Sequence, residues 1–293
     1  MKKYRSEKAG QAILQTYDLL LKEWNTPFQE QDIPTRYGTT HVITAGKENA
    51  PALVLFHGVG DDSALMWIYN AAHLSKFFRI YAVDTLGGPG KSIPGAAYGK
   101  NFDDVIWIDE VFDGLQLESA FVAGVSHGAY MTKLYTLHRP ERVKKALCIS
   151  SSVIEKGAPS TMMEMMKIFL PEALFPTKKN TLRLLRKLSG DHSEVFTDHP
   201  LILAHYQALL RGFNNMAMGF HKVDGFTKEE IEKIREKIFF LVGEKDPFQI
   251  RGGKKRLLEY QLPALFYPDA GHGLNHELAE KINQKITEYF LHE

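Results

Sequence analysis

Apolar and polar positions form a regular series of strand-like and helix-like segments along the first half of the chain. Continuous apolar runs, ALVLFHG at 52–58 and RIYAVDT at 79–85, predict buried β-strands, and a helical pattern lies between them at 63–76. The series continues with a helix at 102–117, a strand at 120–126, a helix at 129–137 and a strand at 144–150. Such alternation predicts an α/β fold with a mostly parallel twisted sheet flanked by helices.

The two ends of the chain extend this body. Apolar residues recur at steps of three and four along 12–24, which predicts an amphipathic helix lying on the body. Residues 27–45 predict a hairpin at a sheet edge. Near the carboxyl end we expect strands at 238–246 and 264–272 and a closing amphipathic helix at 276–290.

The alternation stops in the middle of the chain, where the pattern is helical. We therefore predict a core formed by residues 1–152 and 236–293, with a helical cap of residues 153–235 inserted between them. The insertion falls after the strand that follows the candidate nucleophile described below. No repeat, low-complexity tract or long linker separates independent domains.

The composition is that of a folded protein without a strong net charge. Apolar residues make up 44% of the 293 positions, and 36 Lys and Arg nearly balance 35 Asp and Glu. The net charge of +1 disfavours nucleic acid as a partner, and no uncharged apolar stretch approaches the ~18 residues of a membrane span. A basic run is interpreted as a solvated helical face; it comprises Lys178, Lys179, Arg183, Arg186 and Lys187.

Cysteine usage and the first residues bear on the compartment. Cys148 is the single cysteine, so an intramolecular disulfide is excluded. Gln11, Gln15 and Asp18 interrupt the apolar stretch that a signal peptide would need. We expect a cytoplasmic protein, and the composition leaves its oligomeric state open.

The segment Gly124-Val125-Ser126-His127-Gly128 carries the clearest chemistry. It has the form G-x-S-x-G and lies where an apolar strand gives way to a helix, which is the context that a nucleophile elbow requires. The sharp turn pushes the serine hydroxyl out at the carboxyl edge of the sheet, and the small glycines let the neighbouring elements approach. We predict that Ser126 is a catalytic nucleophile.

Partners for this serine follow in the chain order Ser, Asp, His at the ends of later strands. Asp246 comes just after the apolar run FFLVG, and His272 follows 26 residues later in the loop FYPDAGH. We expect His272 to act as general base and Asp246 to fix its tautomer. Glu244 is the alternative acid.

Acyl transfer also requires donors for the developing oxyanion. The amide of His127 at the helix start can supply one. The turn His57-Gly58-Val59-Gly60 after the strand ALVLF can supply a second from Val59, with Gly60 as the alternative. We expect the His57 side chain itself to be structural.

At these residues the chain resembles the α/β-hydrolase superfamily, specifically its cap-containing, carboxylesterase-like serine hydrolases. The shared motifs are the H-G-x-G turn, the G-x-S-x-G elbow, the G-x-x-D acid loop and the G-H histidine loop, spread over 27–290 apart from the cap. The resemblance implies a catalytic triad of Ser126, Asp246 and His272. It also implies an oxyanion hole formed by the backbone amides of Val59 and His127. We expect no cofactor.

One loop departs from that family's pattern. Relatives often carry D-x-R-G-x-G-x-S after the fourth strand, whereas Asp84-Thr-Leu-Gly-Gly-Pro-Gly-Lys-Ser92 has one extra residue and Leu86 in place of the arginine. A nucleotide-binding loop is disfavoured here, because Thr85 stands where G-x-x-x-x-G-K-S needs its first glycine. Aspartate-nucleophile chemistry is disfavoured by the serine at the elbow.

A metal site is also disfavoured. His272 and His276 lie four residues apart, and the cap holds a second group of possible ligands: Asp191, His192, Asp198, His199 and His205. Neither group has an H-E-x-x-H pattern or cysteines, so we interpret both as helix surface and predict no metal.

The cap holds six of the nine methionines, interleaved with phenylalanines. These side chains can line an apolar pocket over the elbow, or they can simply pack the cap onto the core. The candidate substrate-binding residues are His57, Gly58, Gly60, Met162, Met166 and Phe213.

Together these features predict a serine hydrolase that cleaves a small, largely uncharged carboxylic ester through an acyl-enzyme. The same triad also serves thioester or lactone hydrolysis and carbon–carbon bond cleavage. A catalytically silent hydrolase fold used for binding or signalling is the alternative outside this class.

Overall fold

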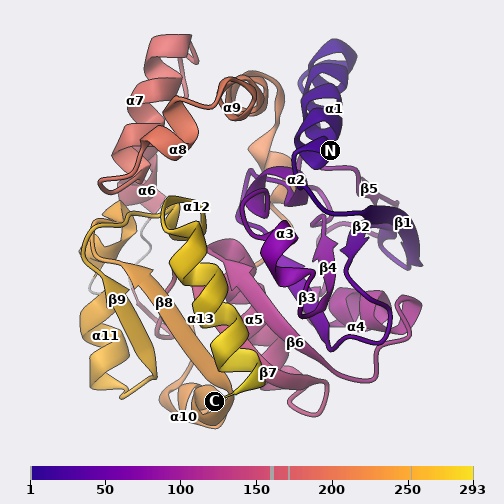
Figure 1. The fold of residues 1–293 in the computed structure, drawn as a ribbon, viewed down its shortest axis with the longest axis vertical. Coiled ribbons are helices and arrows are strands. Elements are labelled where there is room, and N and C mark those ends of the chain that lie inside the picture. The colour runs from indigo at the N-terminus through magenta and orange to yellow at the C-terminus, as the bar shows by residue number, and fades with distance from the viewer. Residues whose placement is uncertain (1, 159–161, 171, 252, 293) are drawn as a thin grey trace.

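The computed structural model describes residues 2–158, 162–170, 172–251 and 253–292 (Figure 1). A nine-stranded sheet has the order β1-β2-β4-β3-β6-β7-β8-β9, with β5 paired to β2. The strands are β1 (Phe28–Thr35), β2 (Gly38–Ala45), β3 (Ala52–Phe56), β4 (Arg79–Val83), β5 (Ile93–Pro94), β6 (Ala120–Val125), β7 (Val143–Ile149), β8 (Ile238–Gly243) and β9 (Ala264–Tyr267). From β4 to β9 neighbouring strands are parallel, which confirms the predicted fold class.

The predicted hairpin forms the edge of this sheet. β1 and β2 are antiparallel and meet at the pair Thr35 and Gly38, and β2 continues antiparallel onto β4. Gly38 has φ 138°, a conformation that glycine adopts readily, and an added Cβ would lie 2.2 Å from the carbonyl oxygen of Ile93. The turn therefore allows β5 to approach closely.

Helices cover both faces of the sheet, with α3 and α13 in front and α4 and α5 behind in Figure 1. Apolar side chains of these helices fill one hydrophobic cluster on each face. The core helices are α1 (Glu7–Lys22), α2 (Ser63–Met66), α3 (Ala71–Leu74), α4 (Asp104–Gly114), α5 (His127–His138), α11 (Gly253–Glu259), α12 (Leu274–Glu277) and α13 (Ala279–Leu291).

The single helix predicted at 63–76 is instead the two short helices α2 and α3. Asn70 lies at the junction, and its side-chain amide donates to the carbonyl of Asn275 and to Oδ1 of Asn283. These contacts join Asn70 to residues far away in the sequence, so local periodicity could not indicate the break between α2 and α3.

The inserted segment contains α6 (Met162–Phe169), α7 (Lys178–Leu188), α8 (Glu194–Thr197), α9 (Pro200–Gly212), the 3-10 helix η1 (Asn215–Met218) and α10 (Lys228–Ile234). We use "cap" below for α6 to η1, which lie above the sheet in Figure 1. By contrast, α10 lies on the core, where Ile231 and Ile234 join the cluster that contains α5. The insert thus returns to the core before β8 begins.

Helix α1 lies on the core, as its apolar periodicity predicts, and it also contacts the cap. It packs along α9, where a Cβ added to Gly212 would lie 2.9 Å from the Cβ of Ala9. Its other neighbour is α2 of the core, and the Nε1–H of Trp24 donates to the carbonyl of Ala64 at 2.9 Å. The amino-terminal helix therefore links the two parts of the molecule.

Candidate active site

Ser126 occupies a strained turn between β6 and α5. Its φ of 56° and ψ of −111° are unusual for a residue other than glycine. Only glycine fits at the two flanking positions, because the neighbouring backbone is too close for a Cβ atom. A Cβ on Gly124 would lie 2.2 Å from the backbone of Gly128, and a Cβ on Gly128 would lie 2.2 Å from the carbonyl oxygen of Phe56. The G-x-S-x-G segment thus has the local geometry expected of a nucleophile elbow.

His272 and Asp246 lie in the loops after β9 and β8, and they contact one another. Nδ1 of His272 donates to Oδ2 of Asp246 at 2.8 Å, because the carboxylate can only accept. The second oxygen, Oδ1, accepts from the amide of Phe248 at 2.8 Å, and the Asp246 side chain is fully buried. This arrangement leaves Nε2 of His272 as the ring nitrogen with a lone pair.

Glu244, the alternative acid, lies elsewhere. Its carboxylate pairs with the ammonium group of Lys254 at the surface. The geometry therefore favours Asp246 as the partner of His272.

The Phe248 ring packs edge-on against the His272 ring, with 4.6 Å between the centroids. Sequence reasoning missed this residue, because the segment Pro247–Arg251 forms the 3-10 helix η3 with no sequence motif of its own.

The glycine-rich turn after β3 lies beside the nucleophile. A Cβ on Gly58 would lie 3.6 Å from the Cβ of Ser126, and Gly60 has φ 74°. Among the described residues, the amides of Val59 and His127 have no hydrogen-bond acceptor. His127 begins α5, so no carbonyl four residues earlier in that helix can bind its amide.

The His57 side chain is fully buried and stabilises this turn, so it is not available to a substrate. Nδ1 lies 2.8 Å from the carbonyl oxygen of Gly58, and Nε2 accepts from the amide of Thr85 at 2.9 Å. Burial lowers the pKa of His57. We therefore correct its assignment as a substrate-binding residue; its contacts are structural.

The loop that departs from the family pattern is held by the carboxylate of Asp84. This buried side chain accepts from the hydroxyl of Tyr17 at 3.0 Å and from the amides of Ser63 and Lys91 at 3.0 and 2.6 Å. A Cβ on Gly90 would lie 2.1 Å from the same carboxylate. A buried anion at this position leaves no place for a phosphate in the loop.

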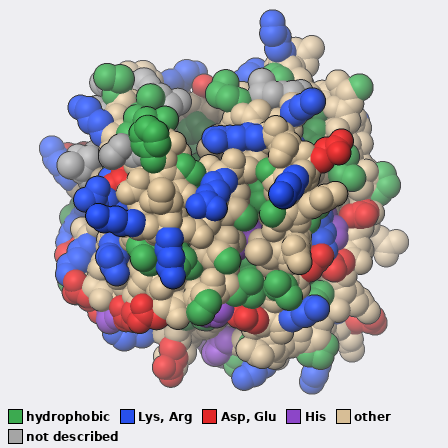
Figure 2. Space-filling model, turned by 90° about the horizontal axis from the view of Figure 1, so that it is seen from above, with side chains coloured by type: hydrophobic (Ala, Val, Ile, Leu, Met, Phe, Trp, Pro, Cys, Tyr) green, Lys and Arg blue, Asp and Glu red, His purple; other side chains and the backbone are tan. Residues whose placement is uncertain are grey.

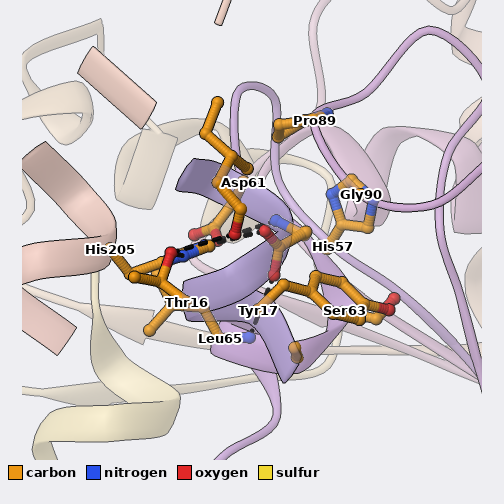
Figure 3. A network of polar contacts seen from close by, with 12 residues as sticks. Thr16, Tyr17, His57, Asp61, Ser63, Leu65, Pro89, Gly90 and His205 are labelled. Atoms are coloured by element: carbon orange, nitrogen blue, oxygen red, sulfur yellow. Dashed lines mark hydrogen bonds and ion pairs between the residues drawn. The ribbon is translucent and has the colours of Figure 1, made fainter. Parts of the chain in front are cut away.

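A second group of polar side chains joins three separate parts of the fold; Figure 3 labels two of its members, Thr16 and His205. Nε2 of His205 in α9 lies 2.8 Å from Oδ2 of Asp62, and Nδ1 lies 2.7 Å from the hydroxyl of Thr16 in α1. Asp62 also caps α2 through the amide of Leu65. Burial would raise the pKa of Asp62, but the charge and hydrogen bond of His205 outweigh it and lower the pKa.

The cap residues predicted to contact substrate have different surroundings. Met166 is 49% exposed, and the Met162 side chain lies outside the described residues. Phe213 is 2% exposed, pairs with Tyr4 through a β-bridge and belongs to the cluster that joins α1 to the cap. These contacts give Phe213 a packing role instead of an accessible surface.

The residues considered as metal ligands are dispersed. His205 pairs with Asp62, His199 with Glu23 and Asp191 with Lys245. Within the described ranges, no three His, Cys, Asp or Glu side chains are grouped as they would be around a metal ion.

Figure 2 shows lysine and arginine side chains spread over the upper face, with hydrophobic side chains between them. On α7, Lys178, Lys179, Arg183 and Arg186 are exposed, as predicted for a solvated helical face, while Lys187 pairs with Glu172. None of the described helices has the length and apolar character needed to cross a membrane.

An open α/β sheet with a serine elbow and an inserted cap defines the class of α/β hydrolases. A family profile for the alpha/beta hydrolase fold matches residues 51–189. The chain is 30% identical over 295 residues to carboxylesterase YbfK of Bacillus subtilis, covering 98% of this chain and 96% of the relative. It is 32% identical over 290 residues to the uncharacterized carboxylesterase nap of the same organism, covering 96% and 93%.

Solved structures agree with these sequence relatives. Carboxylesterase CesB (YbfK) and naproxen esterase (carboxylesterase NP), both from Bacillus subtilis, superpose with TM-scores of 0.81 and 0.83 at 28% and 31% identity. Each comparison covers 98% of this chain and 99% of the solved chain. The chain therefore belongs to the α/β-hydrolase superfamily, among its carboxylesterase-like members.

Proposed function

We propose that this chain is a serine hydrolase that cleaves a small, largely uncharged carboxylic ester through an acyl-enzyme on Ser126. The observation that carries the proposal is the 2.8 Å contact between Nδ1 of His272 and the buried carboxylate of Asp246. This contact fixes the tautomer in which Nε2 can accept a proton. The relationship to carboxylesterases supports the same reaction class.

Acylation begins when Nε2 of His272 takes the proton from the Ser126 hydroxyl as the oxygen attacks the ester carbonyl carbon. The negative charge moves to the carbonyl oxygen, where the amides of Val59 and His127 stabilise it. The carbon–oxygen bond to the alcohol then breaks, and His272 returns the proton to the leaving alkoxide. Asp246 stays ionised and stabilises the imidazolium.

Deacylation repeats these steps with water as the nucleophile. Nε2 of His272 takes a proton from water, and the hydroxide attacks the acyl carbon. Collapse of the tetrahedral intermediate breaks the bond to Ser126, whose oxygen recovers the proton from His272. The net products are a carboxylic acid and an alcohol, and each step uses only side chains, backbone amides and water.

The two imidazoles beside the elbow provide no positive charge to attract an anionic ester, which supports an uncharged substrate. Burial lowers the pKa of His127 to about 3, and it lowers the pKa of His57 as well, so both imidazoles beside the proposed oxyanion site are neutral at pH 7. One relative is called a naproxen esterase. Naproxen esters are thus suitable first substrates, together with short p-nitrophenyl esters.

The test combines covalent labelling with a substrate panel. A fluorophosphonate should label the wild-type protein once, at Ser126, and abolish ester hydrolysis. Ser126→Ala should remain folded by circular dichroism, resist labelling and lose at least about 10³-fold in kcat. Near wild-type hydrolysis by this variant would reject the proposal. Parallel assays with thioesters, lactones and enol diketones establish which bond is cleaved fastest.

A further inference from the structure

The backbone around His272 is bound to the cap as well as to the core. The amide of His272 donates to the carbonyl oxygen of Leu188, the last residue of α7, at 2.7 Å. Nearby, the amide of Asp191 donates to the carbonyl oxygen of Asp269 at 2.8 Å. Residues 188–191 of the cap and 269–272 of the histidine loop therefore form a direct backbone contact.

Two glycines make this contact possible. A Cβ added to Gly190 would lie 2.3 Å from the carbonyl oxygen of Asp269. A Cβ added to Gly271 would lie 2.5 Å from both the amide nitrogen of Gly190 and the carbonyl oxygen of Leu188. Neither backbone can move aside without breaking hydrogen bonds, so any larger residue would separate the cap from the histidine loop.

Glu277 connects the same two segments with its side chain. Its Oε2 accepts from the amide of Gly190 at 2.7 Å, and its Oε1 accepts from the amide of Gly271 at 3.0 Å. The residue is 6% exposed and ends the short helix α12, below the cap in Figure 1. One buried carboxylate thus bridges a cap amide and the amide that precedes His272.

We infer that Glu277 is a positioning residue that couples the seating of the cap to the placement of the His272 imidazole. The inference rests on the proposed role of His272 as general base. Asp246 fixes the ring from the core side, and Leu188 of the cap accepts from the amide of His272. Glu277 of α12 links the histidine loop to the cap through the amides of Gly271 and Gly190. The ring reaches its reacting position only when the cap segment 188–191 is in place, so the cap takes part in catalysis through the histidine loop.

The primary test is Glu277→Gln, which keeps the size of the side chain but offers one carbonyl oxygen and places an NH₂ group against a backbone N–H. Hydrolysis of a p-nitrophenyl ester is measured with active sites counted by fluorophosphonate titration. We expect kcat per active site to fall at least about tenfold while KM stays within about twofold, because proton transfer depends on the position of the base. A purely structural role would lower the number of active sites or the melting temperature without changing kcat per site.

Glu230→Gln is the matched control. The Glu230 carboxylate also accepts from a backbone amide, that of Thr227 at the start of α10, but it lies away from the histidine loop. We expect this variant to keep wild-type kcat and KM. A Glu277→Gln variant with wild-type kcat per active site, or with a raised KM and unchanged kcat, would overturn the inference.

Gly190→Ala tests the coupling from the cap side, and it decides the matter if Glu277→Gln does not fold. Its added Cβ should displace the cap segment and lower kcat per active site, whereas a wild-type kcat would refute the coupling. The Ser126→Ala variant separates the two proposals. If it is inactive and both Glu277→Gln and Gly190→Ala keep wild-type kcat, only the coupling fails; if it stays active, the proposed function fails and the coupling with it.

Discussion

At the scale of single residues, hydrogen bonds already present in the fold decide which groups remain available for chemistry. Both nitrogens of His57 are engaged with backbone groups, and both oxygens of Asp246 are engaged with Phe248 and His272. Nε2 of His272 remains available for the proposed role of general base. The proposed base is thus distinguished from a nearby structural histidine by its partners.

The assignment of the acid predicts an unequal effect of two conservative substitutions. Asp246→Asn should lower kcat by on the order of 10⁴-fold, as in other triads, because an amide presents a donor to Nδ1 and favours the wrong tautomer. Glu244→Gln removes only an exposed pair with Lys254, so its kcat should stay within about twofold of wild type. Steady-state kinetics on one activated ester measure both effects, and the reverse ranking would transfer the acid role to Glu244.

The sequence alone could predict the triad candidates but not the residues that support them. Ser126 lies in a motif defined by its strand–turn–helix context, and Asp246 and His272 follow strands whose apolar runs are recognisable. Glu277 and Leu188 carry no such pattern, because their proposed roles depend on contacts between the cap segment and the histidine loop, which lie about 80 residues apart in the sequence. His57 is the opposite case, because it belongs to a recognisable motif but its side chain only stabilises the turn.

At the scale of elements, three segments distant in sequence meet at one buried point. Helix α1 contributes Thr16, the cap helix α9 contributes His205 and the start of α2 contributes Asp62. Periodicity predicted that helices form in these regions, but it could not indicate that α1 packs on the cap. His205 and Asp62 are separated by 143 positions in the chain, so only the tertiary structure brings them together.

This junction should contribute strongly to stability. The side chains of His205 and Asp62 are both fully buried, so His205→Phe would leave the Asp62 carboxylate buried without its partner. We expect a loss of about 3–5 kcal/mol in the free energy of unfolding, measured by urea denaturation. Asp62→Asn combined with His205→Phe should restore part of that loss. Equal stabilities of wild type and His205→Phe would contradict the assignment.

Packing between α1 and the cap leads to a separate prediction for Phe213. The side chain is 2% exposed within the cluster that joins these elements, so Phe213→Ala should lower the free energy of unfolding by about 3–5 kcal/mol. Because this side chain is packed against protein, the dependence of kcat/KM on acyl chain length should keep its wild-type slope. A flattened slope for p-nitrophenyl esters from acetate to octanoate would instead place Phe213 in the acyl pocket.

At the scale of the whole molecule, the fold buries titratable groups whose pKa shifts have opposite effects on stability. Burial lowers the pKa of His276 to about 4 and that of His127 to about 3, so these side chains are neutral in the folded protein. Burial and the neighbouring charge of Asp62 instead raise the pKa of Asp61 well above its usual range. The free energy of unfolding therefore depends on pH through several opposing contributions. The contribution of one group is best measured by comparing the pH dependence of wild type with that of a variant lacking the group.

His276 offers such a test between pH 4.5 and 6.5. In this range an unfolded imidazole, with a pKa of about 6.5, binds a proton that the folded protein excludes, so this histidine makes stability fall as the pH falls. Its contribution to the slope is at most about 1.4 kcal/mol per pH unit. The free energy of unfolding of His276→Gln, measured by urea denaturation at several pH values, should decrease less steeply on acidification than that of wild type. His292→Gln, which changes an exposed histidine, should keep the wild-type slope; identical slopes for wild type and His276→Gln would show that His276 does not oppose protonation in the folded state.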